Sequence, residues 1–348
     1  MDLTQLLQLA AARGASDLHL SAGLPPRLRQ DGELAAIDHA PLQDGDLRAA
    51  AETLMPAPLR ALWQRGEDVD FASEVPGVGR VRVNAFRQLR GTALVMRLLP
   101  RRIPDLDTLR LPPVVSELLE LPRGLLLVTG PTGSGKSTTL AAMVQRLNQT
   151  QALHILTIED PIEFVHEPAR SLISQRELHR HTQSFASALR SGLREDPDVM
   201  LVGELRDLET IRLALTAAET GHLVLASLHT ASAPKTIDRI IDVFPAGEKE
   251  SVRAMLAESL RAVIAQTLLP AAGGGGRVAA FELMLGTPAI RNLIRENKVA
   301  QMVSVLQTGQ REGMQTLDQA LAVLVRAGLV DAAAARRKAS DPKSLVLA

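Results

Sequence analysis

The segment from Gly130 to Ser137 reads GPTGSGKS and fits the pattern G-x-x-x-x-G-K-[ST] at every fixed position. Glycines in such a run leave backbone N–H groups free to surround a phosphate, the lysine reaches the β- and γ-phosphates, and the last hydroxyl can ligate Mg²⁺. The alternative is a glycine-rich turn that binds nothing. We predict a nucleotide-binding loop formed by Gly130, Pro131, Thr132, Gly133, Ser134, Gly135, Lys136, Ser137 and Thr138.

The residues on either side of this run fit the structural context that it requires. Gly124–Thr129 is a short, continuously apolar segment, which is typical of a buried parallel strand. Ser137–Leu147 carries apolar residues at helical spacing, and the amino end of a helix favours a bound anion. The sequence therefore predicts a strand, a phosphate loop and a helix in succession.

The composition excludes several classes of protein. The formal net charge is zero and aromatic residues make up 2% of the chain, so neither bulk charge nor stacking surfaces favour nucleic acid as a partner. There is no cysteine, which fits a reducing compartment. No apolar run approaches the roughly 20 residues of a membrane span, and the first residues do not resemble a signal peptide. We expect a cytoplasmic protein without direct membrane insertion.

The order of predicted elements indicates two domains of an α/β protein. Residues 1–99 mix helices with alternating strands, including a hairpin around Asp31-Gly32, and form a small α+β domain. A proline-containing stretch over 100–113 reads as a linker. Residues 114–348 alternate apolar strands with helices, which is typical of a parallel sheet, and end in a helical region whose tail after Val330 we expect to fray. The predicted strands of that sheet are 125–129, 153–158, 199–202 and 223–228, followed by a hairpin of 262–269 and 277–284.

Carboxylates and an imidazole directly follow three of these strands. Asp160 and Glu163 follow one strand, Glu204 the next, and His229 a third. Ligands of open α/β sheets bind beyond the carboxyl ends of the strands, where such groups can support Mg²⁺, orient the attacking water and sense the γ-phosphate. The alternative for each is a helix cap or a solvated loop group.

Two other groups of residues have a functional and a structural interpretation. Strict alternation over 79–84 puts Arg80 and Arg82 on one face of a strand, and Arg97 ends the next strand. These arginines are either groups that neutralise γ-phosphate charge or part of a solvated sheet face. His222 lies about 23 Å from His229 along a straight strand, so it either caps a helix or faces a neighbouring subunit.

The motifs resemble those of the bacterial secretion and type IV pilus motor ATPases. Gly130–Ser137 resembles their Walker A motif, 159–164 their aspartate box, 195–207 their Walker B motif and 220–230 their histidine box. Within this family, SDLHLSAGLPP over 16–26, AIRNLIRE over 289–296 and GMQTLDQ over 313–319 are similar to the type IV pilus retraction ATPases. Phe281 and Val303 depart from the histidine and tyrosine that are frequent in relatives.

The resemblance implies a PAS-like amino-terminal domain, a RecA-like P-loop NTPase domain, ATP or ADP as ligand and Mg²⁺ as cofactor. It implies that Glu163 positions the attacking water, that Ser137 and Glu204 support Mg²⁺, and that Arg82 and Arg97 approach the nucleotide. His229 is a further catalytic candidate.

The same resemblance implies a homohexamer that acts on an inner-membrane platform protein, to which it would be peripherally attached. A paralogous retraction ATPase is a possible second partner. Arg291 and Arg295, on the predicted helix 288–296, are candidate contact residues. The alternatives are an accessory or partner-dependent retraction subunit, an extension or type II secretion motor, and a RecA-like helicase, which the neutral charge disfavours.

Overall fold

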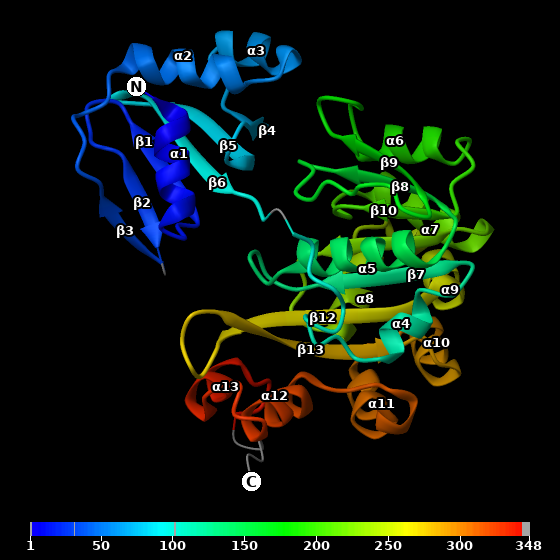
Figure 1. Ribbon diagram of the computed structural model, residues 1–348. Coiled ribbons are helices and arrows are strands. Elements are labelled where there is room, and N and C mark those ends of the chain that lie inside the picture. Colours follow the sequence, from blue (N-terminus) through cyan, green and yellow to red (C-terminus); the bar gives the residue numbers. More distant parts are fainter. Residues whose placement is uncertain (1, 31, 101, 343–348) are drawn as a thin grey trace. The chain divides into compact units, whose positions relative to one another are not determined.

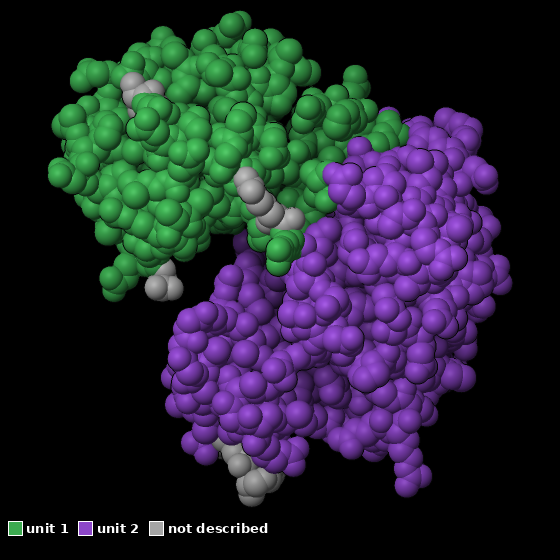
Figure 2. All heavy atoms as spheres, in the orientation of Figure 1, with its two compact units in different colours: residues 1–102, 159–165, 176–184 green, residues 103–158, 166–175, 185–348 purple. Residues whose placement is uncertain are grey.

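The computed structural model describes residues 2–30, 32–100 and 102–342. Its contacts divide the chain into two compact units, which Figure 2 colours separately. The first unit comprises 1–102 together with 159–165 and 176–184, and the second comprises the remainder. The boundary falls inside the predicted linker. The two short segments of the first unit lie, however, within the range that the sequence assigned to the second domain.

The first unit contains a six-stranded antiparallel sheet in the order β3-β2-β1-β6-β5-β4. Glu33–Ala36 follows Arg27–Gln30 in the predicted hairpin, although Asp31 of its turn lies outside the described residues. The strands are β1 (Asp17–Ser21), β2 (Arg27–Gln30), β3 (Glu33–Ala36), β4 (Val69–Val75), β5 (Gly79–Gln88) and β6 (Gly91–Leu98); the helices are α1 (Leu3–Ala12), α2 (Asp44–Leu54) and α3 (Ala57–Gln64).

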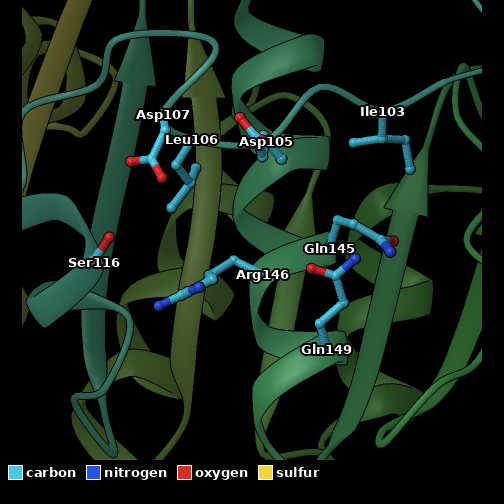
Figure 3. A pocket seen from close by; sticks show the side chains of 9 residues that line it. Ile103, Asp105, Leu106, Asp107, Ser116, Gln145, Arg146 and Gln149 are labelled. Carbon is cyan, nitrogen blue, oxygen red and sulfur yellow. The ribbon is translucent and has the colours of Figure 1, made fainter.

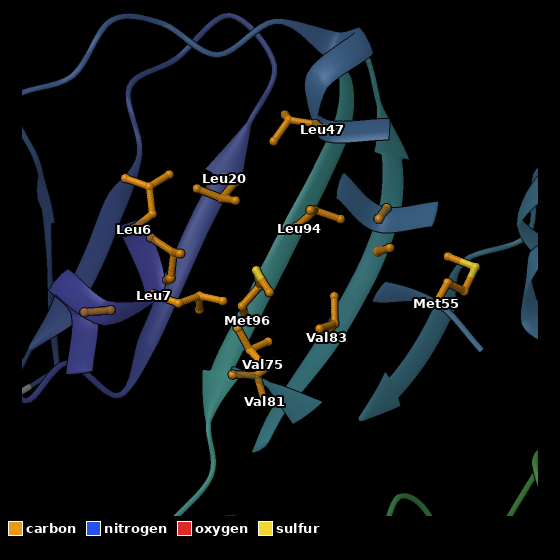
Figure 4. Close-up of a cluster of buried hydrophobic side chains, with 14 of the residues drawn as sticks. Leu6, Leu7, Leu20, Leu47, Met55, Val75, Val81, Val83, Leu94 and Met96 are labelled. Atoms are coloured by element: carbon orange, nitrogen blue, oxygen red, sulfur yellow. The ribbon is translucent and has the colours of Figure 1, made fainter. Parts of the chain in front are cut away.

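Alternation along these strands builds the core of the first unit. Val81 and Val83 of β5 and Leu94 and Met96 of β6 point to one face and are fully buried (Figure 4). Arg80 and Arg82, which alternate with these valines on β5, point to the opposite face, as the sequence predicted. The apolar face is thereby used for packing, and the arginines of the opposite face pair with carboxylates.

The second unit contains a seven-stranded sheet in the order β13-β12-β7-β11-β10-β8-β9 (Figure 1). Neighbouring strands from β12 to β8 are parallel, while β12 and β13 form an antiparallel hairpin. The strands are β7 (Gly124–Thr129), β8 (His154–Glu159), β9 (Leu172–Glu177), β10 (Val199–Val202), β11 (Leu223–Leu228), β12 (Leu260–Pro270) and β13 (Arg277–Leu285).

The central strands are buried along their whole length, which explains why they read as continuous apolar runs. Leu126 and Val128 of β7 pack with Leu140 and Val144 of α5, whereas the alternating residues of β7 face the other side of the sheet. The helices of this unit are α4 (Val114–Leu118), α5 (Lys136–Thr150), α6 (Phe185–Gly192), α7 (Leu208–Thr220), α8 (Ala233–Asp242), α9 (Lys249–Ser259), α10 (Pro288–Arg295), α11 (Met302–Thr308), α12 (Leu317–Arg326) and α13 (Ala332–Lys338).

The structure differs from the expectation for the carboxyl-terminal tail. Residues 332–338 form helix α13, and Ala334 and Ala335 are buried in a small cluster with Leu321 and Leu269. Alanine side chains are short enough for this helix to pack closely against its neighbours. Residues 343–348 lie outside the described part of the chain.

Candidate functional site

The phosphate loop connects the carboxyl end of β7 to the amino end of α5, as the motif requires. The backbone φ values of Gly130, Gly133 and Gly135 are 147°, 76° and 90°, which residues with a Cβ rarely adopt. Gly135 directly precedes α5, so the loop leads into the helix without an intervening turn. The backbone is therefore curled at the three positions where the sequence supplies glycine.

Close packing explains why position 130 must be glycine. A Cβ there would lie 2.4 Å from the carbonyl oxygen of Gln266 and 2.5 Å from Oγ of Ser134. That Ser134 hydroxyl is buried and has no hydrogen-bond partner in the described part of the chain. An unpaired buried hydroxyl beside a cradle that admits no side chain is typical of a loop shaped for an anion.

Gln266 of β12 holds this loop, and the sequence analysis did not identify it. Its side chain is 4% exposed. Its Oε1 accepts a hydrogen bond from Oγ1 of Thr139 at 2.8 Å, and its Nε2 donates to the carbonyl of Ser134 at 2.5 Å. One amide thus fastens the loop to the first turn of α5. No local pattern marks a glutamine in an apolar strand as a loop support.

Three of the predicted site residues come together beside the loop. Nζ of Lys136 donates to the carbonyls of Gly130 and Pro131, at 3.0 and 3.2 Å, and lies 3.5 Å from Nδ1 of His229. The other ring nitrogen of His229 lies 3.3 Å from Oε1 of Glu204. Carboxylate, imidazole and ammonium therefore form a continuous row, as the strand-end argument predicted.

The environment of Glu204 keeps its carboxylate ionised. Partial burial works to raise its pKa, but the hydrogen bond and charge of Arg206, at 2.7 Å, together with His229, outweigh burial and leave the pKa below its ordinary value. An ionised carboxylate is the form that can support a metal ion or orient a protonated group.

The remaining predicted catalytic residues lie in the first unit. Arg82 forms a two-pronged ion pair with Asp70, with Nη2 2.7 Å from Oδ2, and its Nη1 lies 3.7 Å from Oε1 of Glu163. The hydrogen bond with Asp70 is the main reason that the pKa of Arg82 is raised, and Asp160 adds to the effect. Arg97 is paired with the buried Asp17 at 2.9 Å. Both arginines thus already have carboxylate partners.

The other predicted residues are placed as follows. The ring Nδ1 of His222 lies 3.1 Å from the carbonyl of Ala217, which matches the helix-capping alternative. Nε of Arg291, on α10, is buried without a hydrogen-bond partner in the described ranges. Arg295 is exposed at the end of the same helix.

A cavity of about 260 Å³ lies along α5 and is lined largely by polar side chains. Gln145, Arg146 and Gln149 of the helix face the segment from Ile103 to Asp107 (Figure 3). Nothing in its lining defines a ligand, and it does not include the phosphate loop.

The residues present fit a magnesium nucleotide. The loop offers a backbone curled at its glycines, the buried Ser134 hydroxyl without a partner in the described residues, and the ammonium of Lys136. The exposed Ser137 follows in the first turn of α5. The described residues contain no cluster of three or more histidine or acidic side chains able to hold a metal.

The parallel sheet, the loop and the row from Lys136 to Glu204 define a P-loop NTPase. A model for the type II/IV secretion system protein family matches residues 2–273. The chain belongs to this family.

Several relatives extend the comparison. The type IV pilus retraction ATPase PilT of Pseudomonas aeruginosa is 59% identical over 344 residues, covering 99% of this chain and all of that protein. A twitching motility protein of Neisseria gonorrhoeae is 57% identical, covering 92% of this chain and 86% of its own length. A crystal structure of the pilus retraction motor PilT with bound ADP superimposes with a TM-score of 0.90 and 47% identity, covering 99% of each chain.

These comparisons confirm the resemblance and the two-domain α/β fold class predicted from the sequence. The roles assigned to individual residues stay predictions. Among the described residues, no helix combines the length and apolar character needed to cross a membrane.

Proposed function

We propose that this protein is an ATP-hydrolysing motor that powers the retraction of type IV pili, with twitching motility as the cellular result. The observation that carries the proposal is end-to-end similarity to a pilus retraction ATPase, combined with an intact nucleotide loop. A relative that shared only the loop would support nucleotide binding alone. Here the similarity covers both predicted domains.

The residues of the chain have separable tasks in this proposal. The loop amides and Lys136 bind the phosphates, and Lys136 exchanges its present carbonyl partners for phosphate oxygens. Ser137 and Glu204 would hold Mg²⁺, which would supply positive charge to neutralise the phosphates. Glu163 orients the attacking water, and His229 links Glu204 to the phosphate end of the loop. Arg82 and Arg97 neutralise developing charge after leaving their present carboxylate partners.

The proposed assembly is a homohexamer whose amino-terminal domain, residues 1–99, packs on the carboxyl-terminal domain of a neighbour. Residues 100–113 act as the linker, and 114–348 form the ATPase domain. The hexamer works in the cytoplasm on an inner-membrane platform protein. A paralogous motor is a second proposed partner, because a pilus ATPase named PilU is 38% identical over 99% of this chain.

Two other functions are weaker candidates. A secretion or extension motor is disfavoured because the type II secretion proteins among the relatives are 33–34% identical, well below the retraction ATPase. An accessory subunit that does not hydrolyse ATP is disfavoured by the row from Lys136 to Glu204, which a purely structural subunit would not require.

The test is replacement of the chromosomal gene by a Lys136→Ala variant, with surface pili counted and twitching measured. A Lys249→Ala variant is the matched control, because it removes a lysine from a surface ion pair with Asp242. The proposal expects excess pili and no movement for Lys136→Ala, and normal behaviour for the control. Cells without pili would indicate an extension motor, and unchanged cells would contradict a role for ATP.

A further inference from the structure

Glu177, the last residue of β9, is a buried carboxylate that no part of the proposed mechanism uses. It is 3% exposed. Its Oε2 accepts hydrogen bonds from the backbone N–H of Ile162 at 3.1 Å and from Nη2 of Arg80 at 2.8 Å. Its position is fixed by its own backbone, because its N–H donates to Nδ1 of His181 at 2.9 Å and its carbonyl accepts from the N–H of His181 at 2.8 Å.

Arg80 completes the contact from β5. Its Nε donates to the carbonyl of Ile162 at 2.8 Å while its Nη2 binds Glu177, and its side chain is 15% exposed. Both polar groups of the Ile162 backbone are therefore held by one ion pair. Such a pair is costly to bury unless every partner is satisfied, and here the peptide supplies the missing partners.

The residue held in this way is adjacent to Glu163. The carboxylate of Glu163 lies 3.7 Å from Arg82, which stands two positions from Arg80 on the same face of β5. All these residues belong to the first unit, which includes 176–184 at the end of β9, although Arg80 is 82 residues from Ile162 and 97 from Glu177 in the sequence. The backbone just before Glu163 is thus fastened to β5, and its side chain lies beside the next arginine of that strand.

We infer that Arg80 and Glu177 are positioning residues that set the place of the Glu163 carboxylate for ATP hydrolysis. The inference rests on the proposed role of Glu163. Neither residue touches the nucleotide in this scheme, and both act through the Ile162 backbone. A displacement of about 1 Å at a water-orienting group lowers turnover by about 10²-fold, whereas the phosphate loop of the second unit contains neither Arg80 nor Glu177, so its affinity for nucleotide should stay the same.

The test compares purified Arg80→Lys and Glu177→Gln variants with the wild-type protein. Lysine replaces the two guanidinium nitrogens that bind Glu177 and the Ile162 carbonyl by a single nitrogen on a flexible stem. Glutamine keeps the shape of Glu177 without its charge. We expect kcat for Mg-ATP to fall 10- to 100-fold, with the Kd for Mg-ADP within twofold of wild type. The control is Glu74→Gln, because Glu74 pairs directly opposite Arg80 on β4 and is exposed. It should leave both constants unchanged.

A second comparison separates positioning from general destabilisation. If Arg80 acts through Glu163, adding Arg80→Lys to a Glu163→Gln variant should lower kcat no further. The neutral double variant Arg80→Gln/Glu177→Gln guards against misfolding caused by one unpaired buried charge, and its kcat should fall as well.

Three results would overturn the inference. These are a normal kcat in folded Arg80→Lys protein, a parallel loss of kcat and Mg-ADP affinity, or a further loss when Arg80→Lys is added to Glu163→Gln. Failure of the wild-type protein to hydrolyse ATP would instead overturn the proposed function on which the inference depends.

Discussion

Replacing Gln266 by leucine should weaken nucleotide binding although this side chain does not need to touch the nucleotide. The change keeps a similar volume but removes both hydrogen bonds, at 2.8 and 2.5 Å, that connect Thr139 and the Ser134 carbonyl. Because the site is 4% exposed, water cannot readily replace the amide. Each of the two orphaned groups costs about 1–3 kcal/mol, so the free energy of unfolding should fall by about 2–6 kcal/mol.

Part of this loss of free energy should appear as weaker nucleotide binding by the loop. We expect the Kd for Mg-ADP to rise about tenfold, which corresponds to about 1.4 kcal/mol. Titration calorimetry measures the affinity, and denaturant unfolding measures the stability. The control is Gln315→Leu, because Gln315 donates a comparable hydrogen bond, to the Phe281 carbonyl at 2.8 Å, away from the loop. It should lower stability without changing affinity.

A double-mutant cycle tests the reasoning more closely. Thr139→Val removes the hydroxyl that donates a hydrogen bond to Gln266. Because Thr139→Val and Gln266→Leu remove the same interaction, their effects on affinity should not add. We expect a coupling of about 1 kcal/mol or more. Additive effects, or an unchanged Kd in a destabilised Gln266→Leu protein, would refute the claim that Gln266 supports the loop.

Three other predictions follow from single contacts. Gly130→Ala should abolish detectable Mg-ADP binding in a folded protein, because its Cβ would lie 2.4 Å from the Gln266 carbonyl; retained affinity would contradict this reading of the cradle. Burial lowers the pKa of His166 to about 4, so the unfolded protein binds more protons than the folded protein as the pH falls from about 6.5 to 4. The wild-type protein should therefore lose about 2 kcal/mol of stability between pH 7 and pH 5 that the His166→Leu variant does not lose. Equal losses in the two proteins would refute this prediction. Glu282 accepts hydrogen bonds from the first backbone N–H groups of α8 and α12, so Glu282→Leu should lower stability by about 2–4 kcal/mol in denaturant unfolding. Glu282→Gln keeps an acceptor and should lose less. Equal losses for the two variants would count against this capping role.

The nucleotide loop and the central strands were predictable because their signals are local. Gly124–Thr129 is apolar throughout and meets a glycine pattern with fixed spacing, so strand, loop and helix follow in order. The row from Lys136 to Glu204 was predictable for a related reason. Parallel strands bring their carboxyl ends to one edge whatever their separation in sequence.

Other features depend on contacts that no local pattern records. Strand β9 was missed because its residues are mostly half-buried and polar, without clear alternation. The hydrogen bonds of Gln266 join residues that are 127 and 132 positions apart in the sequence. Arg80 and Glu177 are 97 positions apart. The membership of 159–165 in the first unit was missed for the same reason, since this segment contacts the distant residues of β5, as Ile162 contacts Arg80.

If ATP hydrolysis by this protein shortens pili, time-lapse imaging of fluorescently labelled pili will detect it in single cells. Cells with the wild-type gene, with Lys136→Ala and with the Lys249→Ala control would be compared, and the shortening speed of individual pili would be measured. We expect Lys136→Ala cells to extend pili that do not shorten, while the control cells shorten pili at the wild-type speed. Pili that shorten normally in Lys136→Ala cells would contradict it.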